Sequence, residues 1–270
     1  MTTQTIAASE PAPVSASETE MAIVVDNVDI GYGDFMIQRN LNFAVRRGEI
    51  FVIMGGSGCG KTTVMRAMVG LKEPARGRII TDGISFWEAE PPVRERLARS
   101  FGIVYQSGAL WSSMTLAENV ALPLGEYTAL SRADIRDVVS LKLALVGLAG
   151  FEDFYPSEIS GGMRKRAGVA RALALDPKFL FFDEPSAGLD PVTSSLLDDL
   201  IVELRDSLAT TMVMVTHELP SIFSIADNAV YLDAETRTML ATGNPRDLLR
   251  DPPDPKIRNF LTRGGKAEPR

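Results

Sequence analysis

The sequence contains almost no cysteine, and its charge is not weighted towards the basic side. Cys59 is the single cysteine among 270 residues, so an internal disulfide framework is excluded and nothing indicates an oxidising compartment. We therefore expect a cytoplasmic protein. The 28 Lys and Arg residues are outnumbered by 35 Asp and Glu residues, which gives a net charge of -7. Because this charge repels a polyphosphate backbone, nucleic acid is not expected as a general partner.

Long hydrophobic runs and a signal peptide are also missing. No apolar run approaches the ~20 residues needed to span a bilayer, so the chain is not expected to cross a membrane alone. Residues 1–20 have no basic residue and no apolar stretch, which predicts a disordered leader. The 45% of hydrophobic residues suffice for a large buried core, which we place in a domain over residues 21–250. Residues 251–270 mix prolines with charges and predict a short, loosely packed C-terminal tail.

The hydrophobic pattern predicts an α/β fold. Partial alternation predicts a hairpin-like pair of strands over Ala22–Ile30 and Met36–Val45. A short apolar strand over Ile50–Met54 leads through a glycine-rich loop into a helix over Lys61–Val69, which is typical of a parallel α/β sheet. Further buried strands are predicted at Gly102–Tyr105, Phe179–Phe182, Thr211–Val215 and Asn228–Leu232.

The strand pattern is absent between Gln106 and Ser160, which predicts a helical subdomain at about residues 107–165. Within it, Ser131-x-x-Asp134 forms a capping box before a helix that extends to Leu148. A later helix begins with Asp190 as its N-cap and Pro191 at its first position. Its predicted apolar stripe consists of Leu196, Leu197, Leu200, Ile201 and Leu204.

A glycine-rich phosphate-binding loop follows the first buried strand. It fits the pattern G-x-x-x-x-G-K-[ST] between a strand and a helix, and consists of Gly55, Gly56, Ser57, Gly58, Cys59, Gly60, Lys61, Thr62 and Thr63. Its glycines allow the backbone to wrap phosphates, Lys61 adds a positive charge, and the Thr62 hydroxyl is a candidate Mg²⁺ ligand. This pattern predicts ATP and Mg²⁺ as ligands. Cys59 is a candidate reactive thiol or simply a small loop residue.

Polar residues follow three other predicted strands. Asp183 is a candidate Mg²⁺ ligand, and Glu184 is a candidate general base, although acidic residues after strands also cap helices. His217, the only histidine, is predicted to contact the γ-phosphate, with a structural role as the alternative. Gln106 follows a further strand. Because parallel strands end at one edge of a sheet, these residues are expected to meet there.

A second phosphate cradle is predicted at Ser160-Gly161-Gly162-Met163-Arg164. A serine and two glycines at a helix start present bare backbone N–H groups and the positive end of the helix dipole. In the turn between the first two strands, the Tyr32 ring is a candidate for stacking on a nucleobase, or else it covers a sheet edge. One chain therefore contains two candidate phosphate sites far apart in sequence.

Taken in order, these motifs resemble those of the ATP-binding-cassette (ABC) ATPases over about residues 22–243. The resemblance implies a RecA-like P-loop NTPase core with an antiparallel β subdomain and an inserted helical subdomain. It also implies that Tyr32 stacks on adenine, that Gln106 is a Mg²⁺ ligand beside Thr62 and Asp183, and that Asp190 ends a loop that contributes to ATP binding. The catalytic set it implies is Glu184, His217 and Lys61. In this family the Ser160–Arg164 segment, the signature, closes over the γ-phosphate that a second copy holds.

Met163 and the sequence Gln-Ser-Gly-Ala-Leu-Trp from Gln106 are similar to the ATPase subunits of MCE-type (Mla) phospholipid transporters. That resemblance implies an ATPase that moves phospholipid, at the cytoplasmic face of an inner membrane, as a head-to-tail homodimer. The implied partners are an integral membrane permease, an MCE-domain lipid-binding protein and a small STAS-type subunit. Two alternatives stay open: an importer ATPase for a small solute, and a soluble ABC ATPase without a permease. A simple P-loop kinase would not account for the signature or for Gln106.

Overall fold

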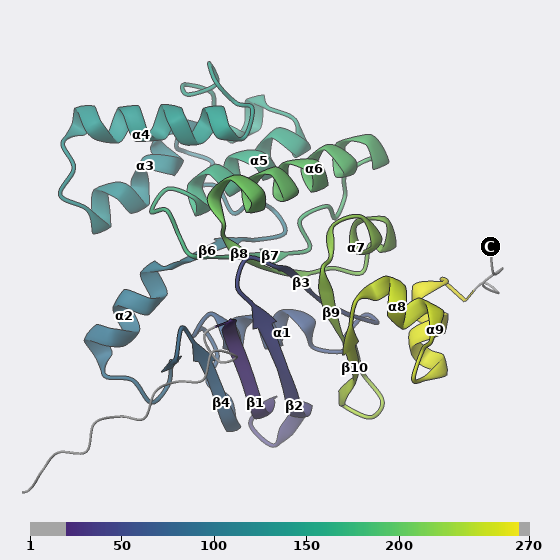
Figure 1. Cartoon of the computed structure of the whole chain (residues 1–270). Helices are drawn as coiled ribbons and strands as arrows, with labels where there is room; N and C mark the ends of the chain where they lie inside the picture. The colour runs from purple at the N-terminus through teal and green to yellow at the C-terminus, as the bar shows by residue number, and fades with distance from the viewer. Residues whose placement is uncertain (1–19, 265–270) are drawn as a thin grey trace, which may run out of the picture.

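The computed structural model describes residues 20–264, so the predicted leader falls outside the described residues apart from Glu20. A central sheet lies between a group of helices, at the top of the view, and a second sheet at the bottom (Figure 1). The central sheet has the strand order β10-β9-β3-β8-β7-β6. Its strands are β3 (Ile50–Gly55), β6 (Phe101–Val104), β7 (Phe179–Asp183), β8 (Thr211–Val215), β9 (Asn228–Asp233) and β10 (Thr238–Gly243).

Neighbouring strands of the central sheet are parallel, except that β10 runs antiparallel to β9 at one edge. Strand β3 shows how the apolar run forms its core. Phe51 and Ile53 belong to the hydrophobic cluster shared with β1 and α1, whereas Val52 and Met54 belong to the cluster under the helices. Both faces of the strand are thus covered, which explains a continuous apolar run. The carboxyl ends of β3, β6, β7 and β8 meet at one edge, where ligands of such sheets bind.

The second sheet is antiparallel, with the order β2-β1-β4-β5. It consists of β1 (Met21–Tyr32), β2 (Phe35–Arg46), β4 (Arg76–Thr81) and β5 (Ile84–Ser85). The predicted hairpin corresponds to β1 and β2 and is confirmed. The pairing of β1 with β4 links segments that are more than forty residues apart in the sequence and lacks a local signal.

The helices include all those that the sequence predicts. They are α1 (Lys61–Met68), α2 (Pro91–Arg99), α3 (Leu116–Tyr127), α4 (Arg132–Leu145), α5 (Gly161–Ala172), α6 (Pro191–Leu208), α7 (Leu219–Ile225), α8 (Pro245–Arg250) and α9 (Pro255–Leu261). A short 3₁₀ turn covers Pro156–Glu158. Helices α3 and α4 form the helical subdomain together with α5, and the capping box of Ser131 and Asp134 is present at the start of α4.

Two details of the helices differ from the sequence-based predictions. Leu196, expected in the buried stripe of α6, is 62% exposed, because the buried face of this helix passes through Leu197, Leu200, Ile201 and Leu204. The tail is not loosely packed as far as the described residues extend. Helix α9 buries Ile257 and Leu261 in the core, and the Phe260 ring lies 5.3 Å from that of Tyr231 on β9.

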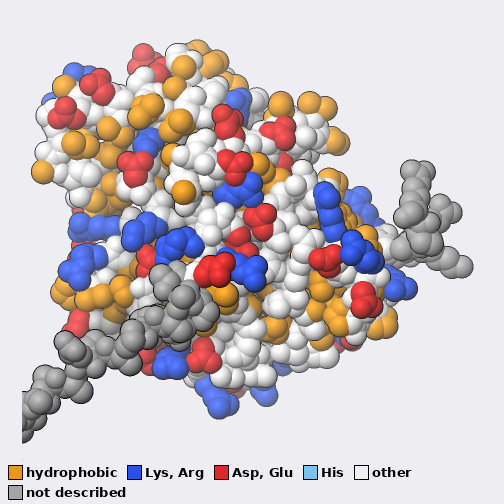
Figure 2. Space-filling view, viewed as in Figure 1, with side chains coloured by type: hydrophobic (Ala, Val, Ile, Leu, Met, Phe, Trp, Pro, Cys, Tyr) orange, Lys and Arg blue, Asp and Glu red, His pale blue; other side chains and the backbone are white. Residues whose placement is uncertain are grey.

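Acidic and basic side chains are interspersed on the face drawn in Figure 2, and apolar side chains gather over the helical subdomain. The exposed apolar residues of that subdomain include Leu122, Tyr127, Leu141 and Leu145. Over residues 20–264, no helix has both the length and the apolar character needed to span a membrane.

One buried carboxyl group makes a pH-dependent prediction. Asp198 on α6 is 5% exposed, and its burial raises its pKa to about 6. A raised pKa means that the protonated carboxyl stabilises the fold below the unfolded value of about 4, and that this stabilisation is lost as the pH rises through 6. Asp198→Asn, a neutral isostere, is therefore expected to raise Tm at pH 8 by roughly 2–4 °C, which corresponds to about 1 kcal/mol in a protein of this size.

The same Asp198→Asn variant should have the wild-type Tm at pH 4, and calorimetry at the two pH values checks both statements. Asp137→Asn, on the exposed surface of α4, is the matched control and should change Tm at neither pH. An equal rise in Tm at pH 4 and pH 8 would show that the charge of Asp198 is not the cause.

Candidate active site

The glycine-rich loop connects strand β3 to helix α1, which is the strand–loop–helix context that its sequence predicts. It leaves β3 at Gly55 and enters α1 after Gly60. Gly60 is the N-cap residue of α1; it has a positive φ of 94° and no side chain that could cap the helix. A Cβ at Gly55 would lie 2.3 Å from the Leu232 carbonyl oxygen, and one at Gly60 would lie 2.3 Å from the Ile37 side chain. Only glycine fits these positions. Because the N-cap glycine provides no side-chain cap, the N-terminal N–H groups of α1 are free to bind an anion.

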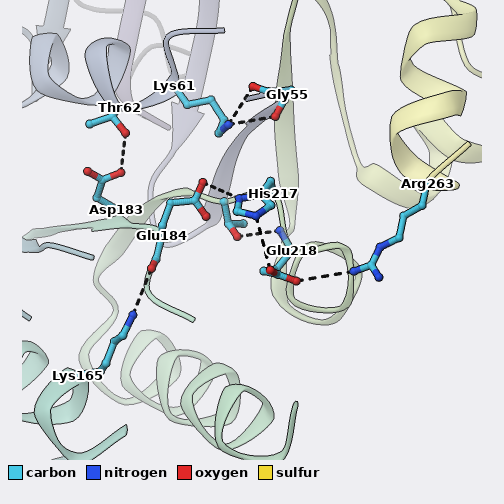
Figure 3. Close-up of polar contacts among 11 residues, drawn as sticks. Gly55, Lys61, Thr62, Lys165, Asp183, Glu184, His217, Glu218 and Arg263 are labelled. Carbon is cyan, nitrogen blue, oxygen red and sulfur yellow. Dashed lines mark hydrogen bonds and ion pairs between the residues drawn. The ribbon is translucent and has the colours of Figure 1, made fainter. Parts of the chain in front are cut away.

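Lys61 lies folded over this loop, as Figure 3 shows. Its Nζ donates hydrogen bonds to the carbonyl oxygens of Gly55 at 3.1 Å and Gly56 at 3.2 Å. The side chain is 8% exposed, so the ammonium charge sits in a poorly solvated position directly above the loop. This position suits an interaction with the outer phosphates of a nucleotide.

The two residues predicted as Mg²⁺ ligands from the phosphate loop and from β7 meet in the structure. Thr62 Oγ1 donates a hydrogen bond of 2.7 Å to Asp183 Oδ1 (Figure 3). A hydroxyl and a carboxylate are hard oxygen donors that fit Mg²⁺, which takes one or two protein ligands and completes its shell with water and phosphate oxygens. Residues 20–264 contain no cluster of three or more His, Cys, Asp or Glu able to hold a metal.

Glu184 and His217 form a direct pair. The Glu184 Oε1 lies 2.9 Å from the His217 Nδ1, and Oε2 is buried with no hydrogen-bond partner. On its other side, His217 Nε2 lies 3.7 Å from Glu218 Oε1. Glu184 has a left-handed backbone with φ of 49°, which turns the chain sharply after β7. The pair therefore occupies one carboxylate oxygen of Glu184, while the other has no hydrogen-bond partner among residues 20–264.

A cavity of about 610 Å³ brings these groups together. Its lining includes the phosphate loop from Gly55 to Gly58, together with Lys61, Gln106, Glu184 and His217. A neighbouring cavity of about 410 Å³ is lined by Gly58, Gly60, Lys61, Thr62 and Thr63. The residues from the ends of β3, β6, β7 and β8 thus meet at one sheet edge, as the sequence predicts. Gln106 is exposed at the wall of the larger cavity.

Tyr32 does not line either cavity. It is 51% exposed, and the Lys72 ammonium lies 4.9 Å from its ring centroid. Phe35, across the same turn, does line the smaller cavity, and the Arg237 guanidinium lies 4.8 Å from its ring centroid. The sequence reasoning missed Phe35 and Arg237. The position of Phe35 in the same turn as Tyr32 could have indicated Phe35 as a candidate. Nothing in the sequence near Arg237 relates it to this turn.

The second cradle lies away from the first. Ser160 caps α5 and accepts a hydrogen bond of 3.3 Å from the Met163 N–H, as predicted. Ser160 and Gly162 line a separate cavity of about 480 Å³ between α4, α5 and α6. No residue of the phosphate loop lines that cavity. Within one chain the two cradles are therefore not brought together.

Asp190 and Cys59 have local roles in the structure. The Asp190 carboxylate caps α6 by accepting hydrogen bonds from the Val192 and Thr193 N–H groups at 3.1 Å each, and the bonds from Thr193 hold its pKa below the usual value. The Cys59 thiol is 1% exposed, and burial raises its pKa, so the thiolate is disfavoured. Of the two interpretations of Cys59, the structure favours the small loop residue.

Comparison with known proteins agrees with this geometry. A family described as "ABC transporter" matches residues 38–187. The "Probable ribonucleotide transport ATP-binding protein mkl" of Mycobacterium tuberculosis is 40% identical over 89% of this chain. This chain covers only 66% of the length of that relative. The "Intermembrane phospholipid transport system ATP-binding protein MlaF" of Escherichia coli is also 40% identical, over 90% of both chains.

The comparison with solved structures leads to the same fold. The cassette MJ0796, solved as a dimer in a post-hydrolysis state with ADP and Pi, has a TM-score of 0.73 and 27% identity. The match covers 82% of this chain and 98% of that one. The predicted fold class is therefore confirmed.

Proposed function

Because this chain belongs to the ABC transporter ATP-binding family, we propose that it is the ATP-hydrolysing subunit of a membrane transporter that moves phospholipid. The observation that carries the catalytic part is the Glu184–His217 pair at 2.9 Å, on the wall of the cavity that the phosphate loop lines. A base and an anion cradle within one cavity are the two parts that nucleotide hydrolysis requires.

The proposed roles follow from where each side chain lies. Lys61 and the loop N–H groups bind the phosphates. Thr62 and Asp183 would hold Mg²⁺, which would supply positive charge beside the phosphoryl group. Glu184 orients the attacking water and accepts its proton. His217 holds Glu184 through Nδ1 and presents its other ring nitrogen at the edge of the cavity. Hydrolysis of this kind releases phosphate, whereas a P-loop kinase would transfer it to a second substrate.

We assign the active unit to a head-to-tail pair of copies. The signature at the start of α5 and the phosphate loop line different cavities of one chain, yet both present bare helix N-termini that suit phosphate. A second copy, turned by a two-fold axis, would supply its signature to the nucleotide held by the first. ATP binding then closes two equivalent sites at once, and hydrolysis opens them.

A groove beside Gln106 is the proposed contact with the membrane permease. It has a volume of about 510 Å³ and lies between the helical subdomain and the central sheet, with Tyr105, Leu122, Pro123 and Tyr127 in its lining. Leu122 and Tyr127 are exposed in this chain. Tyr105 directly precedes Gln106, so an element of the permease in this groove would be one residue from the wall of the nucleotide cavity.

Phospholipid is the favoured substrate class because the MlaF match extends over nearly all of both chains. By the same analogy we propose an MCE-domain protein and a small STAS-type subunit as further partners, and a location at the cytoplasmic face of an inner membrane. The ribonucleotide named for the mycobacterial relative keeps a small solute as the second candidate. These two candidates differ in which extracytoplasmic protein the transporter requires.

Affinity purification of the full chain from detergent-solubilised membranes, followed by mass spectrometry, tests this proposal. We expect a polytopic permease together with an MCE-domain protein. Recovery of a permease with a solute-binding protein in place of the MCE-domain protein would contradict phospholipid transport and would favour the small-solute alternative. Recovery of no membrane protein would contradict the transporter assignment altogether and would favour a soluble ATPase.

A further inference from the structure

Lys165 is a buried cation directly behind the catalytic loop. It lies on α5 and is 6% exposed. Its Nζ donates a hydrogen bond of 2.9 Å to the Ala187 carbonyl oxygen. A longer hydrogen bond of 3.5 Å to the Glu184 carbonyl oxygen is drawn in Figure 3. Burial lowers the pKa of Lys165, and the charge of Glu184 acts against that shift. Since burying an ammonium group is unfavourable, simple packing would be served better by an apolar side chain.

The loop that Lys165 contacts needs external support. The left-handed backbone of Glu184, with φ of 49°, is unfavourable for any residue with a Cβ and persists only where the surroundings enforce it. The Glu184 N–H donates to the Val215 carbonyl oxygen at 2.8 Å, and the Glu184 carbonyl accepts from the Ala187 N–H at 3.2 Å. Lys165 adds the support from α5. It therefore restrains the backbone from which the catalytic carboxylate extends.

The same helix carries the signature at its start. Lys165 lies five residues after Ser160, a distance of about 7.5 Å along an α-helix axis. In the proposed dimer, the N–H groups at the start of α5 face the nucleotide of the partner copy, whereas Glu184 serves the nucleotide of its own chain. If the partner's nucleotide displaces the start of α5, the displacement would therefore be transmitted to the Glu184 backbone through the short, rigid helical segment between Ser160 and Lys165.

We propose that Lys165 is a positioning residue that holds Glu184 in its reactive orientation and couples it to the signature helix. The inference rests on the proposed function, because it requires Glu184 to act on the attacking water. Lys165 itself lines neither of the two nucleotide cavities. Its removal should therefore affect the rate of hydrolysis and leave the affinity for ATP unchanged.

The test is Lys165→Met, which keeps the length and apolar stem of the side chain and removes the donor. We expect kcat to fall by about 10- to 100-fold, the loss associated with small displacements of catalytic groups, with KM for ATP unchanged. Lys165→Gln keeps a shorter donor and should lie between Met and wild type. In an E184Q background, Lys165→Met should still dimerise with ATP, as measured by size-exclusion chromatography.

Lys142→Met is the matched control, because Lys142 is 4% exposed on α4 and pairs with Asp176, away from the nucleotide cavities. It should keep the wild-type kcat. A wild-type kcat in folded Lys165→Met would overturn the inference. If that variant does not fold, a wild-type kcat in Lys165→Gln would overturn it instead. Equal losses of kcat in the two variants would also overturn it. An inactive wild-type chain in the same phosphate-release assay would instead contradict the proposed function, so the two failures are distinguishable.

Discussion

Replacing Glu184 by glutamine is expected to lower the rate of ATP hydrolysis by about 10²- to 10⁴-fold, the usual contribution of a general base. Glutamine has the shape of glutamate and retains an oxygen or an amide group towards His217. It cannot accept a proton from water, however. Because glutamine fills the same space as glutamate, the packing around position 184 and the contact with His217 are kept. The fold should therefore survive the change.

Phosphate release by the complex of the chain with its permease measures the effect of Glu184→Gln, and binding of a fluorescent ATP analogue shows whether the affinity is kept. We expect the affinity to stay at the wild-type value. Glu90→Gln, an exposed residue directly before α2, is the matched control and should hydrolyse ATP normally. Hydrolysis by Glu184→Gln at the wild-type rate would remove Glu184 from the mechanism.

Gly161→Asp is expected to abolish hydrolysis with little effect on folding or on ATP binding. A Cβ at Gly161 would lie 3.8 Å from its nearest neighbours, so a side chain fits there. An acidic residue in the first turn of α5 is also favourable to the helix. In the proposed dimer, however, its carboxylate would face the γ-phosphate of the partner copy. Loss of one hydrogen-bond donor to the charge that develops in a transition state typically lowers the rate about 10²- to 10³-fold.

Mixing two inactive variants separates a shared site from a site within one chain. In a dimer of Gly161→Asp with Glu184→Gln, one composite site has both lesions and the other has none. Partial recovery of phosphate release is therefore expected in the copurified mixed dimer, relative to either variant alone. If the signature acted on the nucleotide of its own chain, each copy would keep one lesion at its own site and no activity would return.

The motifs that the sequence predicts correctly are those with local causes. The phosphate loop follows from the local run of glycines before Lys61 and Thr62, and the Ser160 cap follows from its own side chain and the Met163 N–H. The family assignment depends on these segments and is confirmed. The roles of the individual site residues stay predictions, although Thr62 with Asp183 and Glu184 with His217 do meet in space.

What the sequence does not predict depends on contacts between distant segments. Lys165 reaches a carbonyl 22 residues further along the chain, and nothing in its immediate sequence distinguishes it from Arg164 and Arg166 beside it. Arg237 approaches Phe35 from the turn between β9 and β10. The packing of α9 likewise required knowledge of the apolar surface that β9 offers to Ile257 and Phe260. A stretch of prolines and charges conceals such a surface.

The buried sulfur atom of Cys59 makes this chain convenient for spectroscopy. It is the only cysteine in the sequence, it is 1% exposed, and burial raises its pKa, so alkylating reagents should leave it unmodified in the folded protein. The natural chain is therefore silent towards thiol-specific probes. A single cysteine introduced at the exposed Leu196 would carry one spin label per copy, and the distance between two such labels would report the opening and closing of the dimer directly.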